Sequence, residues 1–451
     1  MIPVVTPDEM AAIDAAAPEP VDVLIERAGA AVARHALELL GGAYGRRVVV
    51  VAGKGNNGND GRAAARRLRA RGVKVTEIDA ASPPPVLPSC DLVIDAAYGT
   101  GLRQPYSAPE VPRSALVLAV DIASGVDGKT GEIRGRPMPA HRTVTFAALK
   151  PGLLLEPGRT LCGDVRVADI GLDVSGARAH LVEDADVARW WPSRPVDTHK
   201  WRRAVWVVAG SPGMTGAAHL ASAAAMRAGS GYVRLSTPGG ADDVAAPTEV
   251  VRVPIGRDLH LDERDVKRFG AVLVGPGLGR DDDIAASVRE LVASVGAPVV
   301  VDGDGLTALG ARAADVLRAR SHAAVLTPHD GEFAALGGQD PSADRFAAVR
   351  DLAARLGAVV LLKGPTTLVA EPEGRVLVST RGDQRLATAG TGDVLAGTIA
   401  ALLAGGVAPF EAAAAGAFIH GTAAMLAPRH GMVAGDLVAL LPRAIARVWE
   451  D

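Results

Sequence analysis

The chain has 451 residues, a formal net charge of −3, and a composition of 48% hydrophobic and 22% charged residues. This length exceeds what one hydrophobic core normally serves, so we expect two or three domains. The charge balance lacks the basic excess of nucleic-acid-binding proteins, and we predict no nucleic-acid partner. Cys90 and Cys162 have no metal-type spacing, which is typical of a reducing, cytoplasmic setting.

The start of the chain and its apolar runs favour neither export nor membrane insertion. The first basic residue is Arg27, so a basic secretory signal is not expected. One long uncharged run, residues 394–410, is interrupted by glycines and a proline. It is also shorter than the ~20 apolar residues of a membrane span. We therefore expect a cytoplasmic protein with no membrane partner.

The first half of the chain alternates strand-like and helix-like segments. Residues 21–40 are expected to form a helix, and residues 47–52 contain consecutive valines, as in a strand buried on both faces. A glycine-rich turn, a helix and a strand over residues 73–78 follow. Further strands are predicted over residues 92–95, 115–122 and 143–146. This order predicts a Rossmann-like three-layer α/β domain with a parallel sheet.

The turn after the first strand combines glycines with polar side chains. Its glycines, within residues 53–58, match the G-x-G-x-x-G pattern of dinucleotide-binding folds, which is weak evidence alone. The polar residues are Asn56, Asn57, Asn59 and Asp60. Amide and carboxylate oxygens at this place indicate several hydrogen bonds to a polar substrate, or ligands for a cation. The alternative is that these asparagines only adopt left-handed turn geometry.

Polar residues also follow three later strands. Asp95 and Asp121 each end a predicted strand, and Lys150 follows the strand predicted over residues 143–146. The carboxyl ends of parallel strands converge on one crevice. The sequence therefore predicts that these residues and the asparagine-rich turn form one site.

These motifs resemble the NAD(P)H-hydrate epimerase family over most of residues 1–175. The resemblance implies that Asn57, Asp95 and Ser124 hold a potassium ion and that Asp121 is catalytic, contacting the substrate at the reacting carbon. It implies a substrate-binding set of Asn56, Asn57, Gly58, Asn59, Asp60, Gly99, Thr100, Gly101, Leu102, Arg103, Asp121 and Lys150. Two positions depart from the family: Asn59 is usually glycine there, and Ala123 is usually proline.

The texture of the sequence changes near residues 174–195, so we predict domains over residues 1–178 and 179–451. A second α/β pattern then begins. Its strands are predicted over residues 204–209, 271–274, 299–301, 324–326 and 359–362, and its final helices over residues 394–404 and 409–426. This pattern predicts a second parallel sheet with an alanine-rich helical end.

Polar or glycine-rich turns recur at the predicted strand ends of this half. They cover residues 210–217, 275–279, 301–304, 327–332 and 363–367. A last one, around Gly390 and Gly392, places Asp393 where an apolar helix begins. Glycines let backbone N–H groups approach a phosphate, and a helix N-terminus favours negative charge. Asp393 is then a candidate base, or alternatively only the N-cap of the helix.

Taken in order, these turns resemble the ribokinase-like superfamily and, more closely, its nucleotide-dependent NAD(P)H-hydrate dehydratases, over residues 198–427. The resemblance implies that Asp393 is the catalytic base. Substrate would contact Ala217, Gly277, His329 and Asp393, and ADP would contact Lys363, Gly364, Pro365, Thr366, Thr367 and Gly392, with Mg²⁺ accompanying the nucleotide. Trp201 stands where the family usually has glycine.

Together the resemblances imply a bifunctional repair enzyme. Its first domain would interconvert the R and S epimers of hydrated NADH and NADPH (NADHX and NADPHX). Its second would dehydrate the S form with ADP, and a homo-oligomer is expected. Two alternatives stay open: a ribokinase-like small-molecule kinase fused to a non-catalytic nucleotide-binding domain, and a first domain that only docks nucleotides or a partner.

Overall fold

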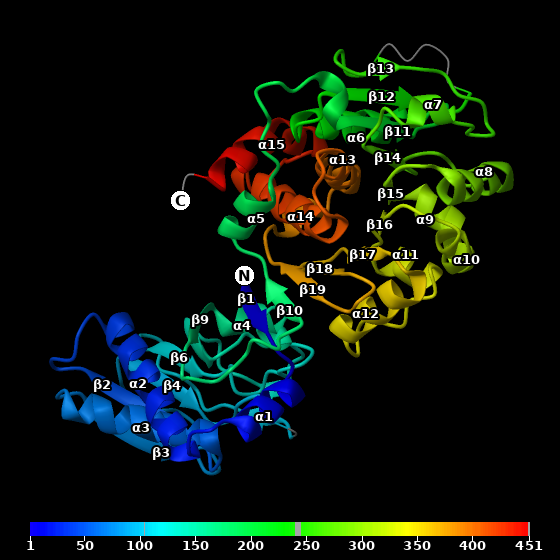
Figure 1. Ribbon diagram of the computed structural model, residues 1–451. Coiled ribbons are helices and arrows are strands. Elements are labelled where there is room, and N and C mark those ends of the chain that lie inside the picture. Colours follow the sequence, from blue (N-terminus) through cyan, green and yellow to red (C-terminus); the bar gives the residue numbers. More distant parts are fainter. Residues whose placement is uncertain (103, 240–244, 450–451) are drawn as a thin grey trace. The chain divides into compact units, whose positions relative to one another are not determined.

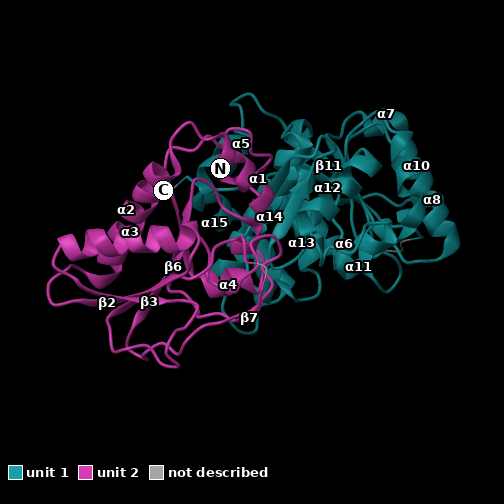
Figure 2. Ribbon diagram, turned by 90° about the horizontal axis from the view of Figure 1, so that it is seen from below, with its two compact units in different colours: residues 1, 180–451 teal, residues 2–179 magenta. Residues whose placement is uncertain are grey.

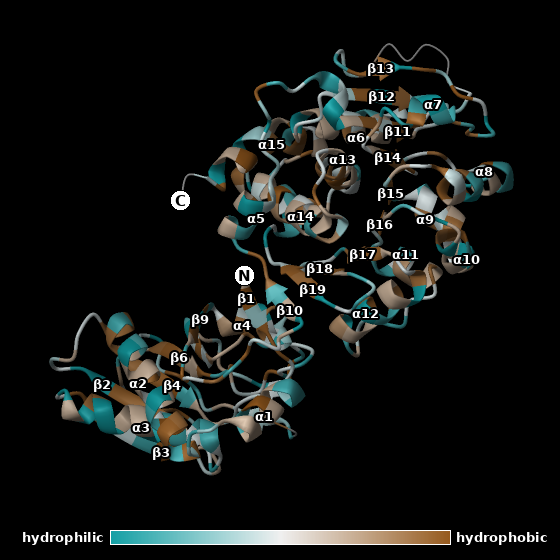
Figure 3. Cartoon of the chain, in the orientation of Figure 1, coloured by the Kyte–Doolittle hydropathy of each residue, from teal (hydrophilic) through white to brown (hydrophobic). Residues whose placement is uncertain are grey.

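The computed structural model describes residues 1–102, 104–239 and 245–449. The chain forms two compact units, one of residues 2–179 and one of residues 180–451 with Met1 (Figure 1 and Figure 2). Figure 3 shows hydrophobic residues along the strands of both units. In the described ranges, none of the helices combines the length and the apolar character that crossing a membrane requires.

The first unit contains a six-stranded sheet in the order β3-β2-β4-β6-β8-β9, with every neighbouring pair parallel. These strands are β2 (Arg47–Ala52), β3 (Lys74–Asp79), β4 (Leu92–Ala96), β6 (Leu116–Val120), β8 (Arg142–Phe146) and β9 (Asp164–Ala168). The short strands are β1 (Ile2–Val4), β5 (Tyr106–Ser107) and β7 (Gly135–Arg136). Every residue of β4 is buried, as in a strand covered on both faces.

Two helices cover this sheet side by side. α2 (Val21–Leu40) contacts β4, β6 and β8, and α3 (Asn56–Ala70) contacts β2, β3, β4 and β6. A Cβ atom at Gly29 of α2 would lie 2.4 Å from the Cβ atom of Ala63, so this glycine permits the close helix contact. The remaining helices are α1 (Pro7–Ala16), the 3₁₀ helix η1 (Pro151–Leu153) and α4 (Gly158–Cys162).

The second unit contains a longer sheet in the order β10-β19-β18-β17-β16-β15-β14-β11-β12-β13. The run from β17 to β13 is parallel, whereas β18 pairs antiparallel with both β17 and β19. The strands are β10 (Ala179–Leu181), β11 (Ala204–Val208), β12 (Tyr232–Ser236), β13 (Val251–Arg252), β14 (Ala271–Val274), β15 (Val299–Val301), β16 (Ala324–Leu326), β17 (Val359–Leu362), β18 (Thr367–Ala370) and β19 (Val376–Ser379).

Helix α13 (Thr391–Ala404) lies at the centre of the second unit. It contacts β11, β14 and β15 as well as α6 (Thr215–Arg227), α14 (Pro409–Leu426) and α15 (Ala434–Arg447), which explains why it is mostly apolar on all sides beyond its first turn. The other helices are α5 (Asp184–Trp190), α7 (Glu263–Val266), α8 (Asp282–Ser294), α9 (Asp304–Leu309), α10 (Ala313–Arg318), α11 (Asp330–Ala335) and α12 (Arg345–Leu356), with 3₁₀ helices η2 (Lys200–Arg203), η3 (Gly310–Arg312) and η4 (Gln384–Leu386).

Most predicted elements lie within two residues of the observed ones, and three differences matter for the sites. Residues 56–60 form the first turn of α3 and not a turn before it, with Gly55 as the N-cap. The strand predicted over residues 115–122 ends at Val120, because Asp121 adopts a left-handed conformation with φ of 66°. The antiparallel strands β18 and β19 are absent from the prediction.

We expect Gly397→Ala to destabilise the second unit. In α13 a Cβ atom at this position would lie 2.1 Å from the carbonyl oxygen of Ala221 in α6, so the two helices would have to separate. Overpacking of this kind costs about 1–3 kcal/mol, and calorimetry should record a lower melting temperature. Gly435→Ala in α15 is the matched control, because nothing lies within 4 Å of the added atom. Equal melting temperatures for Gly397→Ala and the parent would contradict this packing.

Candidate functional sites

A cavity of about 660 Å³ opens at the carboxyl edge of the first sheet. It is the place where the structure brings most of the first predicted site together. From that predicted set, its lining includes Asn56, Asn57, Asp60, Gly99, Thr100, Gly101, Leu102, Asp121 and Lys150. Gly58 and Asn59 belong to the same turn of α3, and Arg103 lies outside the described residues.

Asp121 and Lys150 form a buried ion pair in this cavity. The Lys150 Nζ donates to Asp121 Oδ1 at 2.7 Å, and the hydroxyl of Thr145 donates to the same oxygen at 3.0 Å. Lys150 is only 1% exposed. Burial alone would raise the pKa of Asp121, but the charge of Lys150 and these hydrogen bonds hold that pKa below its usual value. Asp121 is therefore an ionised carboxylate inside the cavity.

The first turn of α3 brings Asn57 and Asp60 to the cavity. Gly58 is required here, because a Cβ atom at this position would lie 1.9 Å from the carbonyl oxygen of Gly53. None of the asparagines in this turn has a positive φ, so the left-handed-turn alternative is wrong. Both side-chain polar atoms of Asn57 are buried without a hydrogen-bond partner. Burial, with Asp121 and Asp14 nearby, raises the pKa of Asp60 to about 8.

Asp95 and Ser124 lie together behind the cavity. Ser124 donates to the Asp95 carboxylate from its hydroxyl at 2.7 Å and from its backbone N–H at 2.9 Å. Asp95 is fully buried, burial raises its pKa, and no basic side chain in the described part of the chain forms an ion pair with it. A buried carboxylate without a counter-charge is costly, and either protonation or a bound cation would relieve that cost.

The segment Gly99–Thr100 connects these groups. A Cβ atom at Gly99 would lie 3.2 Å from Asp121 Oδ2 and 3.3 Å from Asn57 Oδ1, so the glycine keeps space open between them. Sequence reasoning missed Met10 and Asp14, which also line the cavity from α1. The capping box of Thr6 and Glu9 predicts this helix, but no motif indicates that it faces a site.

The second predicted site lies at the carboxyl edge of the second sheet, where α13 begins. Gly390, in a left-handed conformation, is the N-cap of α13, and Asp393 is the third helical residue. The alternative that Asp393 is the N-cap is therefore wrong. Burial raises the pKa of Asp393 to about 7; Asp302 adds to this effect and Lys363 opposes it. A carboxylate with this pKa can exchange a proton near neutral pH.

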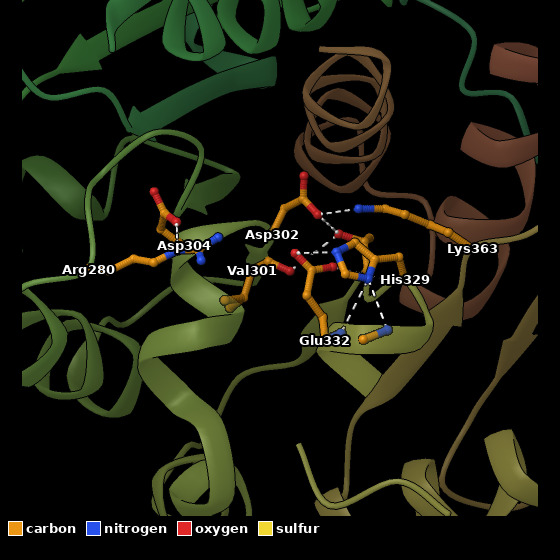
Figure 4. A network of polar contacts seen from close by, with 9 residues as sticks. Arg280, Val301, Asp302, Asp304, His329, Glu332 and Lys363 are labelled. Atoms are coloured by element: carbon orange, nitrogen blue, oxygen red, sulfur yellow. Dashed lines mark hydrogen bonds and ion pairs between the residues drawn. The ribbon is translucent and has the colours of Figure 1, made fainter. Parts of the chain in front are cut away.

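Polar groups from three neighbouring strands converge beside α13 (Figure 4). Asp302 follows β15, Thr327 follows β16, and Lys363 follows β17. Asp302 Oδ1 accepts hydrogen bonds from Lys363 Nζ at 2.5 Å and from the Thr327 hydroxyl at 2.7 Å. The sequence predicts a polar strand-end turn over residues 301–304 but does not predict Asp302 as a site residue.

His329 is the N-cap of helix α11 at the same edge. Its Nδ1 accepts hydrogen bonds from the backbone N–H groups of Gly331 and Glu332, and the Glu332 carboxylate accepts from the His329 backbone. The imidazole is 62% exposed and thus reachable by a ligand. Gly277 and Ala217, two other predicted substrate contacts, lie next to each other: a Cβ atom at Gly277 would be 3.3 Å from the Cβ atom of Ala217.

The segment from Lys363 to Thr367 connects β17 with β18. Arg345 donates to the Lys363 carbonyl at 2.6 Å, and a Cβ atom at Gly392 would lie 3.4 Å from Lys363 Nζ. Lys363 and Gly392 are thus adjacent. Thr366 is buried, whereas Gly364 and Pro365 are exposed turn residues.

Comparison with known proteins identifies the family. Residues 205–447 match the family model described as NAD(P)H-hydrate dehydratase, and residues 21–90 and 76–152 match the one described as YjeF-related protein N-terminus. The bifunctional NAD(P)H-hydrate repair enzyme Nnr of Salinibacter ruber is 35% identical, over 98% of this chain and 96% of its own. The enzyme of the same name from Mycobacterium tuberculosis is 40% identical, over 83% of this chain and 82% of its own. The chain belongs to the bifunctional NAD(P)H-hydrate repair enzyme family.

Solved structures match the second unit of this family member. The ADP/ATP-dependent NAD(P)H-hydrate dehydratase of Bacillus subtilis, co-crystallised with ATP and Mg²⁺, is 28% identical with a TM-score of 0.51, covering 59% of this chain and 97% of that one. A ribokinase-like superfamily protein of Enterococcus faecalis, 23% identical with a TM-score of 0.53, covers 62% of this chain and 98% of its own, and bears on the fold alone. The ribokinase-like prediction is confirmed. Repair-enzyme relatives spanning both units support that function over the kinase alternative.

Proposed function

We propose that the first unit interconverts the R and S epimers of NADHX and NADPHX and that the second dehydrates the S epimer with ADP. One observation carries the proposal: each family-matched half holds its own cluster of buried titratable groups at the carboxyl edge of its own sheet. Epimerisation then supplies the form that the second site accepts. Homo-oligomerisation and a cytoplasmic location stay predictions from the resemblance.

In the first unit, Asp121 is placed to act on the reacting carbon of the hydrated ring. The ion pair with Lys150 keeps this carboxylate charged and oriented, and the first turn of α3 offers amide groups to the substrate. The apolar residues in the cavity lining, Met10, Leu24 and Phe146 among them, would limit the contact of the reacting ring with water. Asp121 and the α3 turn then act on the same substrate from two strand ends.

The donor set near Asn57 fits a potassium ion. Its amide oxygen is buried without a partner, and the Asp95 carboxylate beside Ser124 lacks a counter-charge among the described residues. Asn57, Asp95 and Ser124 would hold the ion, which would neutralise Asp95 and orient polar substrate groups. One carboxylate with neutral oxygens suits a monovalent ion better than a divalent one.

In the second unit, Asp393 would take the proton of the substrate hydroxyl while that oxygen accepts a phosphoryl group from ADP. Phosphorylation makes the oxygen a good leaving group, and its elimination restores the nicotinamide ring. Backbone N–H groups at the start of α13 and the Lys363 ammonium would stabilise the phosphoryl oxygens. Ala217, Gly277 and His329 would contact the substrate, and residues 364–367 and Gly392 the nucleotide.

Magnesium would accompany ADP. No group of three or more His, Cys, Asp or Glu side chains that could hold a metal ion lies in the described ranges. In nucleotide sites Mg²⁺ commonly keeps several waters and binds the substrate phosphates, and we expect the same here. Bound there, it would neutralise phosphate charge.

Asp121→Asn tests the first site. Asparagine tolerates the left-handed backbone at this position but cannot act as a carboxylate. The epimerisation rate, measured by chromatographic separation of the two epimers, should fall about 100-fold or more. Dehydration of the pure S epimer, measured as ADP-dependent recovery of NADH absorbance, should persist. Asp164→Asn, at the exposed start of β9, is the control and should retain both activities. Equal loss of both activities in a folded Asp121→Asn protein would contradict the two-site division.

Potassium should affect the first unit more than magnesium does. We expect KCl to raise the epimerisation rate and the unfolding temperature of the first unit, relative to NaCl or MgCl₂ at equal ionic strength. Asn57→Ala removes the unpartnered amide oxygen and should abolish the response. A response that is the same for all three salts would argue against the site.

Asp393→Asn tests the second site. Without a general base, dehydration should slow by about 10²–10⁴-fold, while ADP binding by calorimetry and epimerisation persist. Since only the ionised carboxylate is a base, the parent rate should rise with pH through about 7. The pKa of Asp393 is higher in the folded chain than in the unfolded chain, so at pH 8 its ionised carboxylate disfavours folding. The neutral amide of Asp393→Asn removes this cost, and the variant should not melt at a lower temperature than the parent at pH 8. Dehydration within a few-fold of the parent would exclude Asp393 as the base.

A further inference from the structure

We infer that Asp302 is a positioning residue of the second site, whose buried carboxylate holds the Lys363 ammonium against the first turn of α13, one step away from Asp393. This inference rests on the proposed role of Asp393 as the base. Asp302 is not among the residues expected to contact the substrate or the nucleotide, so its role would be indirect. Asp302 would act on the reaction through Lys363 and Asp393.

The first argument is the geometry of the pair. Asp302 is 2% exposed and follows β15, and its Oδ1 accepts from Lys363 Nζ at 2.5 Å across the end of β16. The Thr327 hydroxyl, at the end of β16, donates to the same oxygen at 2.7 Å. Three adjacent strands thus fix the carboxylate, and the carboxylate fixes the end of a flexible lysine side chain. Figure 4 shows Lys363 reaching across to Asp302.

The second argument is where the pair points. A Cβ atom at Gly392 would lie 3.4 Å from Lys363 Nζ and 3.8 Å from Asp302 Oδ2. Gly392 is the second residue of α13 and precedes Asp393. Both charges therefore face the helix turn that would receive the phosphoryl group, and the absent side chain at Gly392 leaves room for that group.

The third argument is charge balance around Asp393. Asp302, Asp304 and Lys363 act on its charge, and Arg280 bonds to Asp304 at 2.8 Å. His420 of α14 contacts the Thr391 carbonyl at 2.9 Å but is neutral, since burial lowers its pKa to about 4. An ammonium bonded directly to Asp393 would make that carboxylate a weak base. Asp302 binds the ammonium instead, so Lys363 serves the phosphoryl group while Asp393 keeps its basicity.

The test is the pH dependence of S-epimer dehydration in the full chain. Asp302→Asn keeps an oxygen acceptor for Thr327 and Lys363 but removes the negative charge. The midpoint of the rate increase should move to lower pH by about half a unit or more, because a neighbouring anion no longer opposes ionisation of Asp393. Lys363→Gln should move the midpoint to higher pH, and the double variant should fall between the two. Asp315→Asn, exposed on α10, should leave the midpoint unchanged.

A second readout does not depend on activity. In protein labelled with ¹³C at aspartate carboxyls, the NMR resonance that disappears in Asp393→Asn is the one from Asp393. Its titration midpoint should move in each variant in the same direction as the midpoint of the rate. An unshifted or upward midpoint in a folded, active Asp302→Asn protein would overturn this inference and leave the proposed function intact. A parent chain that cannot dehydrate the S epimer would instead contradict the proposed function, and the carboxyl titration would still decide whether Asp302 acts on Asp393.

Discussion

Each site depends on one buried carboxylate held by one lysine at the carboxyl edge of a parallel sheet. In the first unit the pair is Asp121 with Lys150, and in the second it is Asp302 with Lys363. Burial of either charge alone would cost several kcal/mol, whereas the hydrogen-bonded pair is compatible with a packed interior. The strands impose the pairing: Asp121 and Lys150 follow the neighbouring strands β6 and β8, and Thr327 lies between the strand ends that carry Asp302 and Lys363.

In each site a second acid, outside the lysine pair, has a pKa raised by burial. In the first cavity Asp121 is held ionised while burial raises the pKa of Asp60 to about 8. In the second site Asp302 takes the lysine while burial raises the pKa of Asp393 to about 7. In the first unit the pKa values of Asp121 and Asp60 are thus pushed in opposite directions, and two such acids can take separate roles near neutral pH. The lysine pair thus leaves Asp121 as an ionised carboxylate in the first unit, and Asp393 as a carboxyl group that titrates near neutral pH in the second.

The sequence predicted the strands and the convergence of their ends better than it predicted the walls of the sites. Uninterrupted valines mark buried parallel strands, and the polar residues after them must meet at one edge, which is why Asp121 and Lys150 could be grouped. Asp14 was missed because α1 reaches the cavity through tertiary packing that no local pattern encodes. Asp302 was undervalued because Asp-Gly-Asp after a strand is also typical of an ordinary turn. Strand β18 was missed because its antiparallel pairing with β17 and β19 is a tertiary contact that its own short sequence does not encode.

Two of the three positions that the resemblance marks as departures, Asn59 and Trp201, are accommodated by local contacts. Asn59 lies inside the first turn of α3, where its amide oxygen accepts a hydrogen bond from Arg62 at 3.2 Å. Trp201 packs on Tyr232 with ring centroids 4.3 Å apart, and the Arg268 guanidinium lies 3.7 Å from its ring. Trp201 precedes β11 and so lies at the amino edge of the sheet, whereas Asp302, Lys363 and Asp393 gather at the carboxyl edge. A bulky residue there changes the packing of the strand's start without entering the site, because the length of the sheet separates the two edges.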